Sequence, residues 1–193
     1  MEYTINLRKI KALQFLAADR RDVRIYLNGV HVKVVNRTEG AVDVTYTATN
    51  GHIVGQMTTW STAKDQGEPM ELIIPEDVLK QIKMGRADPD RALLVVEEGV
   101  HSIKLLDGRV YPFVSVDGKY PSNVLDIFNS AQESEPEPAA FDMVLMAQFV
   151  KLAKMMDVKH EGHFVIEHKG WNGAPITHSE IQGFKGVIMP FRQ

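Results

Sequence analysis

The sequence predicts an α+β protein whose antiparallel sheets come from a unit of strand, helix and strands that occurs three times. Three observations lead to this fold class. β-Branched runs with alternating polarity are separated by turn pairs such as Asn50-Gly51 and Glu98-Gly99. Apolar residues recur at helical spacing in three stretches. The order of strand, helix and strands restarts twice along the chain, which indicates an internal repeat.

Composition restricts the function classes. The chain has 193 residues, a net charge of −3 and no cysteine. Its length allows one good core, or one domain plus a fragment. The lack of cysteine excludes disulfides, thiolate catalysis and cysteine-type zinc sites. With no apolar run long enough to span a membrane and no signal peptide, we expect a soluble, cytoplasmic protein without a membrane partner. DNA binding would require local positive charge, because the chain as a whole is acidic.

The first module is predicted over residues 1–64. A short strand at Tyr3–Asn6 leads into a helix from Leu7 to Ala18, with Asn6 as its N-cap. Two hairpins follow. The first joins Val23–Leu27 to Val30–Val35 through Asn28-Gly29, and the second joins Val42–Thr47 to Ile53–Met57 through Asn50-Gly51.

The second module is predicted over residues 68–130 and repeats this plan. We expect a strand at Met70–Pro75, a helix at Glu76–Met84, a hairpin of Ala92–Glu97 with His101–Leu106, and a last strand at Arg109–Val116. Acidic residues open the helix and Lys80 and Lys83 come later, as the helix dipole favours.

Residues 131–140 are acidic and contain proline, with almost nothing to bury, so they are predicted to be a solvated linker. The third module follows at 141–193. After a short strand, Leu145, Phe149, Leu152 and Met156 form one helical stripe. Strands are expected at His163–His168, Ile176–Ile181 and Phe184–Pro190.

Four motifs carry a resemblance to a known family. They are RDVRIYLNG at 21–29, ATNGH at 48–52, DGKYP at 117–121 and GVIMPFR at 186–192. Together they resemble the bacterial sliding clamp, the β subunit of DNA polymerase III. The resemblance implies the DNA-clamp (processivity) fold, with 1–130 as one complete domain similar to the clamp's middle domain. Residues 141–193 would be a half-domain similar to the clamp's C-terminal module.

The resemblance also implies a cleft that binds short peptides of DNA polymerases and clamp loaders. By matching motifs, its residues are Thr49, Gly51, His52, Val54, Val187, Ile188, Met189, Pro190, Phe191 and Arg192. Three positions depart from the family pattern: Asn50 replaces Asp, Ile53 replaces Arg and Phe191 replaces Met. From the residues alone, the segment from Val187 to Met189 is equally compatible with a core strand.

Basic residues gather on the predicted helices of this acidic chain. They are Arg8, Lys9, Lys11, Lys80, Lys83, Arg86, Lys151 and Lys154. One interpretation is a surface that faces double-stranded DNA and contacts phosphates without reading sequence. The alternative is an ordinary solvated helix face, because Lys and Arg are good helix formers. The resemblance favours the DNA interpretation.

Two other features have weaker functional readings. His160, His163, His168 and His178 are close in sequence, but their spacing matches no standard metal motif, so surface histidines are favoured over a metal site. Trp60 is expected to be half-buried, and Trp171 is either a partner contact or packed on a sheet edge.

No catalytic constellation is present, so we predict no enzyme and no cofactor. The predicted function is a clamp-like processivity factor or scaffold that binds DNA and replication peptides and forms homo-oligomers, dimers or higher. The main alternative is a clamp-derived regulatory module that binds proteins and does not encircle DNA. A histidine-site enzyme is a third, distant alternative.

Overall fold

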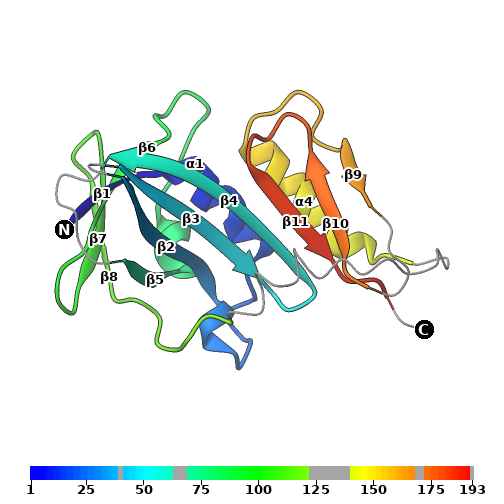
Figure 1. The fold of residues 1–193 in the computed structure, drawn as a ribbon, viewed down its shortest axis with the longest axis horizontal. Coiled ribbons are helices and arrows are strands. Elements are labelled where there is room, and N and C mark those ends of the chain that lie inside the picture. The colour runs from blue at the N-terminus through cyan, green and yellow to red at the C-terminus, as the bar shows by residue number, and fades with distance from the viewer. Residues whose placement is uncertain (39–40, 63–68, 122–139, 168–171, 192–193) are drawn as a thin grey trace.

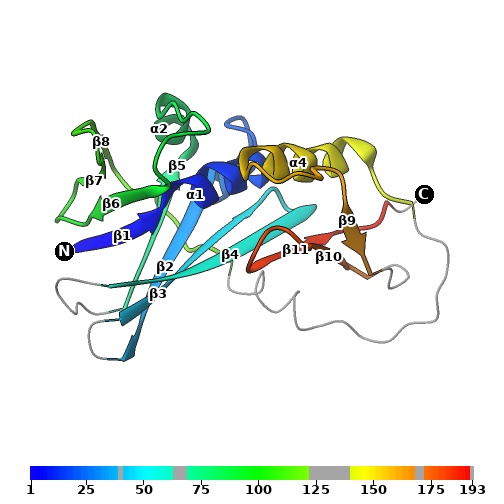
Figure 2. The same cartoon turned by 90° about the horizontal axis from the view of Figure 1, so that it is seen from above.

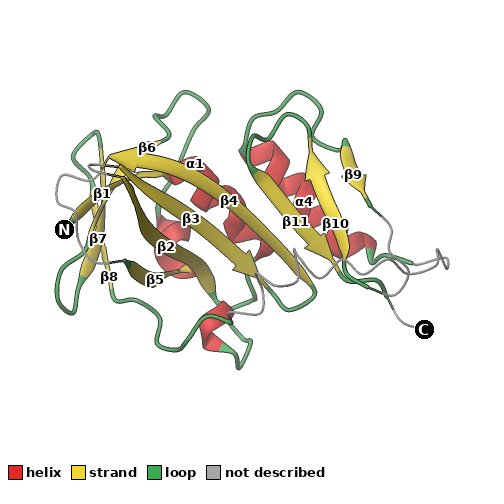
Figure 3. Ribbon diagram, viewed as in Figure 1, coloured by secondary structure: helices red, strands yellow, loops and turns green. Residues whose placement is uncertain are grey.

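The computed structural model describes residues 1–38, 41–62, 69–121, 140–167 and 172–191. Their strands form two antiparallel sheets, a larger one in the order β5-β2-β3-β4-β11-β10-β9 and a smaller one in the order β1-β6-β7-β8 (Figures 1 and 3). Figure 2 shows the helices α1, α2 and α4 on one side of the larger sheet. The predicted α+β class with antiparallel sheets is therefore confirmed.

Apart from the strand predicted at Val23–Leu27, the elements follow the predicted order. The first module has β1 (Glu2–Asn6), α1 (Leu7–Leu13), the 3-10 turns η1 (Gln14–Leu16) and η2 (Ile25–Leu27), β2 (Gly29–Thr38), β3 (Ala41–Thr49) and β4 (Ile53–Thr62). The second has β5 (Met70–Pro75), α2 (Glu76–Gln81), β6 (Arg91–Val95), β7 (His101–Leu105) and β8 (Val110–Phe113). The third has α4 (Met143–Met155), β9 (Phe164–Ile166), β10 (Ala174–His178) and β11 (Phe184–Ile188).

The first two modules exchange their first strands. β1 pairs with β6 of the second module, from Glu2 opposite Val95 to Asn6 opposite Arg91. In return, β5 pairs with β2 of the first module. The helix that follows each exchanged strand begins in the same way, because its first N–H bonds to the residue just before the partner strand: Leu7 N to Asp90 O at 2.6 Å, and Glu76 N to Asn28 O at 3.1 Å. Neither module can complete its sheet alone.

Alternation along the strands decides which face meets the helices. In β2, Val30, Val32 and Val34 are buried in the main core, which they share with Ile10 and Leu13 of α1. The Tyr46 hydroxyl accepts a hydrogen bond from the Asn6 N–H at 2.9 Å. Burial raises the pKa of Tyr46 to about 12. This bond fixes the junction between β1 and α1, where Asn6 is the N-cap as predicted.

The third module continues the larger sheet. β11 pairs with β4, and the pair Gly55 and Gly186 lies in the middle of this junction. A side chain at Gly55 would collide with Leu16, and one at Gly186 would collide with Ile176 and Phe184. Because both positions lack a side chain, Leu16 and Phe149 from the helical layer can pack directly against the backbone of the two paired strands. Phe149 of α4 is fully buried here, against the rings of Phe164 and Phe184.

The first predicted hairpin is wrong. Val23–Leu27 does not form a strand: Ile25–Leu27 is a 3-10 turn, and Asn28 has φ −86°, whereas the tight turn requires positive φ. β2 already has β3 on one edge and β5 on the other, so no edge remains for a partner from this segment. The second hairpin, around Asn50-Gly51, forms as predicted.

Several element ends also differ from prediction. The first helix becomes a 3-10 turn after Leu13, the second ends at Gln81, and the strand predicted at Arg109–Val116 covers only Val110–Phe113. In the third module β10 begins two residues early and ends at His178, and the strand before α4 is a single bridge between Ala140 and Phe191. Trp60 is 68% exposed rather than half-buried. Trp171 and the linker at 131–139 lie outside the described residues.

None of the helices in the described part of the chain is long and apolar enough to cross a membrane.

The strand exchange predicts that β1 contributes to the stability of the whole chain. Ile5 is 1% exposed and lies in the core shared by both modules. We expect Ile5→Ala to lower the free energy of unfolding by about 2–5 kcal/mol, since it leaves a cavity. Urea unfolding followed by circular dichroism measures this. Thr4→Ala, a half-buried neighbour on the same strand, is the matched control, and an equal loss in both variants would contradict the prediction.

Candidate functional site

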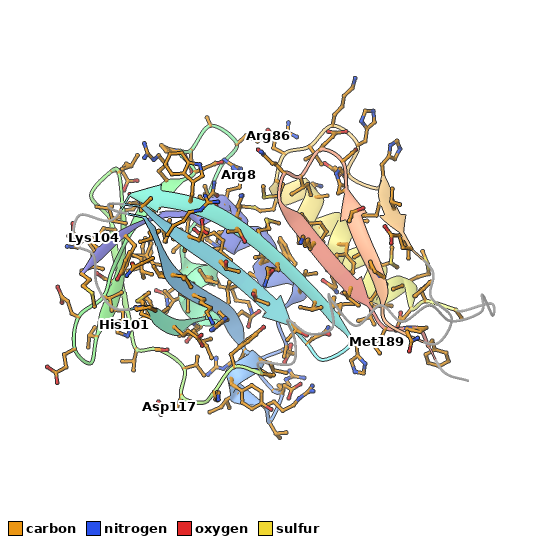
Figure 4. All side chains as sticks on the ribbon, viewed as in Figure 1. Arg8, Arg86, His101, Lys104, Asp117 and Met189 are labelled. Carbon is orange, nitrogen blue, oxygen red and sulfur yellow. The ribbon has the colours of Figure 1, made fainter. Side chains whose placement is uncertain are left out.

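A cavity of about 270 Å³ opens beside the turn between β3 and β4. Its walls come from three places that are distant in sequence: the segment around η2, the β3–β4 turn and the end of β11, with Pro121 closing one side. The lining residues are Arg24, Tyr26, Leu27, Thr49, Gly51, His52, Ile53, Val54, Pro121, Val187 and Met189. Figure 4 shows Met189 at the end of β11, beside this turn.

The β3–β4 turn is held rigidly by its own side chains. The Asn50 side-chain oxygen accepts hydrogen bonds from the N–H groups of His52 and Ile53, at 2.9 and 3.0 Å. The Thr49 hydroxyl donates to Ile53 O at 2.6 Å and accepts from Gly51 N at 3.0 Å. Gly51 has φ +91°, which side chains rarely adopt. This geometry presents His52 at the rim of the cavity.

Arg24 fixes the opposite wall. Its guanidinium makes two bonds to the Asp22 carboxylate, at 2.9 and 2.6 Å, and a third to Asn50 O at 3.1 Å. The hydrogen bond from Arg24 lowers the pKa of Asp22 to about 2, so this carboxylate is charged at neutral pH. A Cβ on Gly51 would lie 2.6 Å from Arg24 Nη1. Glycine at this position therefore permits both the turn and the contact with Arg24.

A second apolar cluster lies on the face of the sheet opposite the helices and supports the cavity. It contains Ala18, Leu27, Val54, Ile73, Tyr120 and Val187. The Tyr120 ring stacks on His31, with centroids 4.5 Å apart and planes at 8°. This stack places Pro121 at the edge of the cavity.

His31 sits between opposing influences. Its Nε2 lies 3.4 Å from Glu71 Oε2, and this carboxylate favours the charged ring. Lys33 Nζ pairs with the other oxygen of the same carboxylate, Oε1, at 2.7 Å. Burial outweighs the attraction of Glu71 and lowers the pKa of His31. Neutral imidazole therefore stacks on Tyr120 under ordinary conditions.

The structure brings together six of the ten residues predicted for the peptide cleft: Thr49, Gly51, His52, Val54, Val187 and Met189. Ile188 and Pro190 are buried instead, Phe191 is exposed and forms the bridge to Ala140, and Arg192 lies outside the described residues. Sequence reasoning missed Arg24, Tyr26, Leu27, Ile53 and Pro121. Four of these five lie inside the motifs at 21–29 and 117–121, so the motifs themselves were the available signal.

Arg8, predicted to face DNA, is buried at 7% exposure. Figure 4 labels Arg8 and Arg86. The Arg8 guanidinium donates hydrogen bonds to Asp90 and to the carbonyl oxygens of Gly85, Arg86 and Asp88. The prediction for Arg8 is therefore corrected: this side chain holds the loop after α2 and is not available to an external phosphate.

The other predicted bases divide into two groups. Lys9 and Lys11 donate to Thr58 O and Leu79 O, and burial lowers the pKa of both ammonium groups. The second group is exposed on the helical side: Lys80, Lys83, Arg86, Lys151 and Lys154. Within it, Lys80 pairs with Glu76 and Arg86 with Asp157. We call these five residues the exposed basic group.

The histidines of the third module are engaged with one another and with Glu180. His160 bonds to Glu180 at 2.6 Å and stacks on His163. Both ring nitrogens of buried His178 have partners, His160 O and Glu180 N. Across the described residues no three His, Asp or Glu side chains are grouped to hold a metal ion, and His168 lies outside them.

The comparisons with known proteins identify the fold. No family model matches the chain, and no curated protein matches it. Solved structures do. The DNA polymerase III β subunit of Pseudomonas aeruginosa matches with a TM-score of 0.63 and 15% identity, covering 100% of this chain and 67% of that one. A sliding clamp of Bartonella birtlesii bound to griselimycin matches with a TM-score of 0.70, 14% identity and coverage of 100% and 66%.

A sliding clamp of Caulobacter crescentus gives a TM-score of 0.62 at 15% identity, with coverage of 100% and 65%. The chain therefore has the sliding-clamp fold that its motifs predicted, and it spans about two thirds of the length of these clamps. At such low identity the likeness concerns the fold.

The buried position of Arg8 predicts a structural role. Arg8→Ala would leave three loop carbonyls without their donor, so we expect a loss of about 2–3 kcal/mol in the free energy of unfolding, measured in urea. Lys83→Ala, an exposed base near the same loop, should change it by about 0.5 kcal/mol or less. If the two variants unfold alike, Arg8 does not hold the loop.

Proposed function

We propose that this chain is a clamp-like binding scaffold whose cavity between the β3–β4 turn and β11 takes a short linear peptide of a replication protein, such as a DNA polymerase or clamp loader. The observation that carries this proposal is the convergence of the four motif segments on one cavity. It is a binding protein rather than an enzyme, and we place it in the cytoplasm with its partners.

The chemistry of the cavity suits a peptide with apolar side chains. Leu27, Val54 and Val187 supply apolar walls, and Met189 adds a flexible, polarizable surface that adapts to different side chains. The volume is slightly below the roughly 300–1,000 Å³ typical of small-molecule pockets, which fits one or two side chains of a linear motif. Ile53 makes the turn less charged than the family pattern and favours apolar ligands.

The exposed basic group supports weak, sequence-independent binding of double-stranded DNA. Its five residues belong to α2, the loop that follows it and α4, and Figure 2 shows both helices on the same side of the larger sheet. Cations spread over such a surface contact phosphates without reading bases. Because the chain spans only about two thirds of a clamp, encircling DNA would require several copies, and we propose that the protein self-associates.

The second candidate is a regulator that binds the same peptides without encircling DNA. A specific observation favours it: Arg8, Lys9 and Lys11, three of the eight predicted DNA-facing bases, donate hydrogen bonds to backbone carbonyl oxygens of the chain itself. In this case the chain would bind peptides at the cavity and would not bind DNA at the exposed basic group. Peptide and DNA binding measured separately distinguish the two candidates.

The peptide proposal predicts a specific loss of affinity. We expect a clamp-binding peptide that contains glutamine, leucine and phenylalanine to bind, and Met189→Ala to weaken binding about 5–30-fold, because a buried methionine contributes about 1–2 kcal/mol. Fluorescence anisotropy of the labelled peptide measures this. Met143→Ala on exposed α4 is the control. Absence of binding by the parent chain, or no effect of Met189→Ala, would refute the proposal.

The DNA proposal predicts a salt-dependent interaction. Replacing the exposed basic group by glutamine should abolish binding of a duplex oligonucleotide, and each lost phosphate contact should lower the slope of log K against log salt by about 0.9. Lys119→Gln with Lys185→Gln removes exposed charges from elsewhere on the surface and should leave binding unchanged. If DNA binding survives replacement of the exposed basic group while peptide affinity is unchanged, the DNA site on this face is refuted.

A further inference from the structure

Among the described residues, the third module has no capping strand of the kind that the first two modules exchange. β2 and β6 begin the sheets of those modules, and β5 and β1 of the opposite module cover their outer edges. β9 holds the corresponding place in the third module, and no strand lies outside it in the part of the chain that the structure describes (Figure 1). The described segment before α4 is not exchanged either, since Ala140, three residues before the helix begins, bridges to Phe191 of its own module.

Apolar side chains are exposed beside this open edge. Gln148 lines a hollow together with Lys11 and Phe15, which marks the flank of α4 that faces α1. At 100° per residue, Met143 and Val150 share the other flank, and they are 76% and 38% exposed. On the opposite face of the sheet Val165 of β9 is 59% exposed. An apolar helix flank next to an uncapped edge is a surface for another sheet-forming element.

We propose that the occupant is a second copy of this chain, which pairs its β9 with this one about a two-fold axis, so that two half-domains complete each other. The fold itself shows this arrangement: the first two modules complete each other by reciprocal strand pairing. The inference concerns assembly and does not depend on the peptide cavity, which lies on other elements.

The backbone of β9 specifies the register. Glu167 N–H bonds to Pro175 O of β10, so the alternation of an antiparallel ladder turns the backbone groups of Val165 toward β10 and those of Ile166 outward. A two-fold axis through Val165 then joins each outward Ile166 N–H to the Phe164 carbonyl of the second copy. The two Val165 side chains face each other in a pair without hydrogen bonds, where cross-strand side chains are nearest.

The flanking charges are complementary in this register. His163 of one copy lies opposite Glu167 of the other, twice by symmetry, and both side chains are exposed in the single chain. Phe164 lies opposite Ile166 on the core side. Each position therefore meets a residue of suitable chemistry, and like charges are not brought together. A shift by one residue would put the polar residues on the core side of the sheet.

The assembly test measures mass in solution. The chain has a mass of 21.7 kDa, and we expect a species of twice this mass by sedimentation equilibrium. Val165→Asp puts two carboxylates opposite each other and should raise the dissociation constant at least about ten-fold. Val110→Asp changes a similarly exposed valine on β8, an edge strand of the smaller sheet, and should leave the dimer intact. A parent chain that is monomeric at high concentration, or a dimer dissociated by Val110→Asp instead, overturns the proposal.

Two further variants test the register. The natural chain has no cysteine, so Val165→Cys introduces a single thiol, and diamide, which takes up the two hydrogens, should join two copies by one disulfide, while Val110→Cys remains unlinked. Glu167→Lys should weaken the dimer, and adding His163→Glu should restore it. No cross-link at Val165, or no rescue by the double change, overturns this register. Peptide anisotropy on Val165→Asp separates the outcomes, because the monomer should keep the affinity of the parent cavity.

Discussion

The reciprocal pairing of β1 with β6 and of β5 with β2 is the constraint on which the rest of the chain depends. Each of the first two modules contributes its first strand to the other, and the helix after that strand starts from a hydrogen bond to the partner module. The helices therefore lie on one side of a shared core, and the opposite face of the larger sheet remains open. That open face carries the second apolar cluster and the cavity above it.

The cavity depends on this sheet in two ways. β4 is the strand that ends the first module and also pairs with β11, so Val54 and Val187 lie directly opposite each other in its floor. The segment leaving β8 crosses the sheet and is anchored by Tyr120 on His31. A site made of four segments thus depends on the pairing of β4 with β11 and on the segment that crosses the sheet after β8, and no residue of α1, α2 or α4 lines the cavity.

Local patterns predicted the elements better than they predicted contacts. Alternation of Val42, Val44 and Tyr46 and the Asn50-Gly51 turn gave the β3–β4 hairpin correctly, because both features act within a few residues. Asn28-Gly29 has the same turn composition, yet the edges of β2 are occupied by distant strands, which no local pattern reveals. Arg8 and Lys83 are both basic residues on predicted helices, so the sequence gives no reason to expect one buried and the other exposed. Only the fold places Arg8 among loop carbonyls. The family motifs located six cavity residues because they specify a tertiary arrangement.

Strand exchange also affects how the chain folds during its synthesis. Tyr3 and Ile5 have no sheet to join until Arg91–Val95 have been made, so β1 leaves the ribosome long before its partner exists. At about 5–20 residues per second this interval is roughly 4–17 s. During that time an apolar strand and the following helix are exposed in the nascent chain. Such unpaired apolar segments make a folding intermediate prone to aggregate, so a chaperone that shields the first 20 or so residues would protect this chain during that interval.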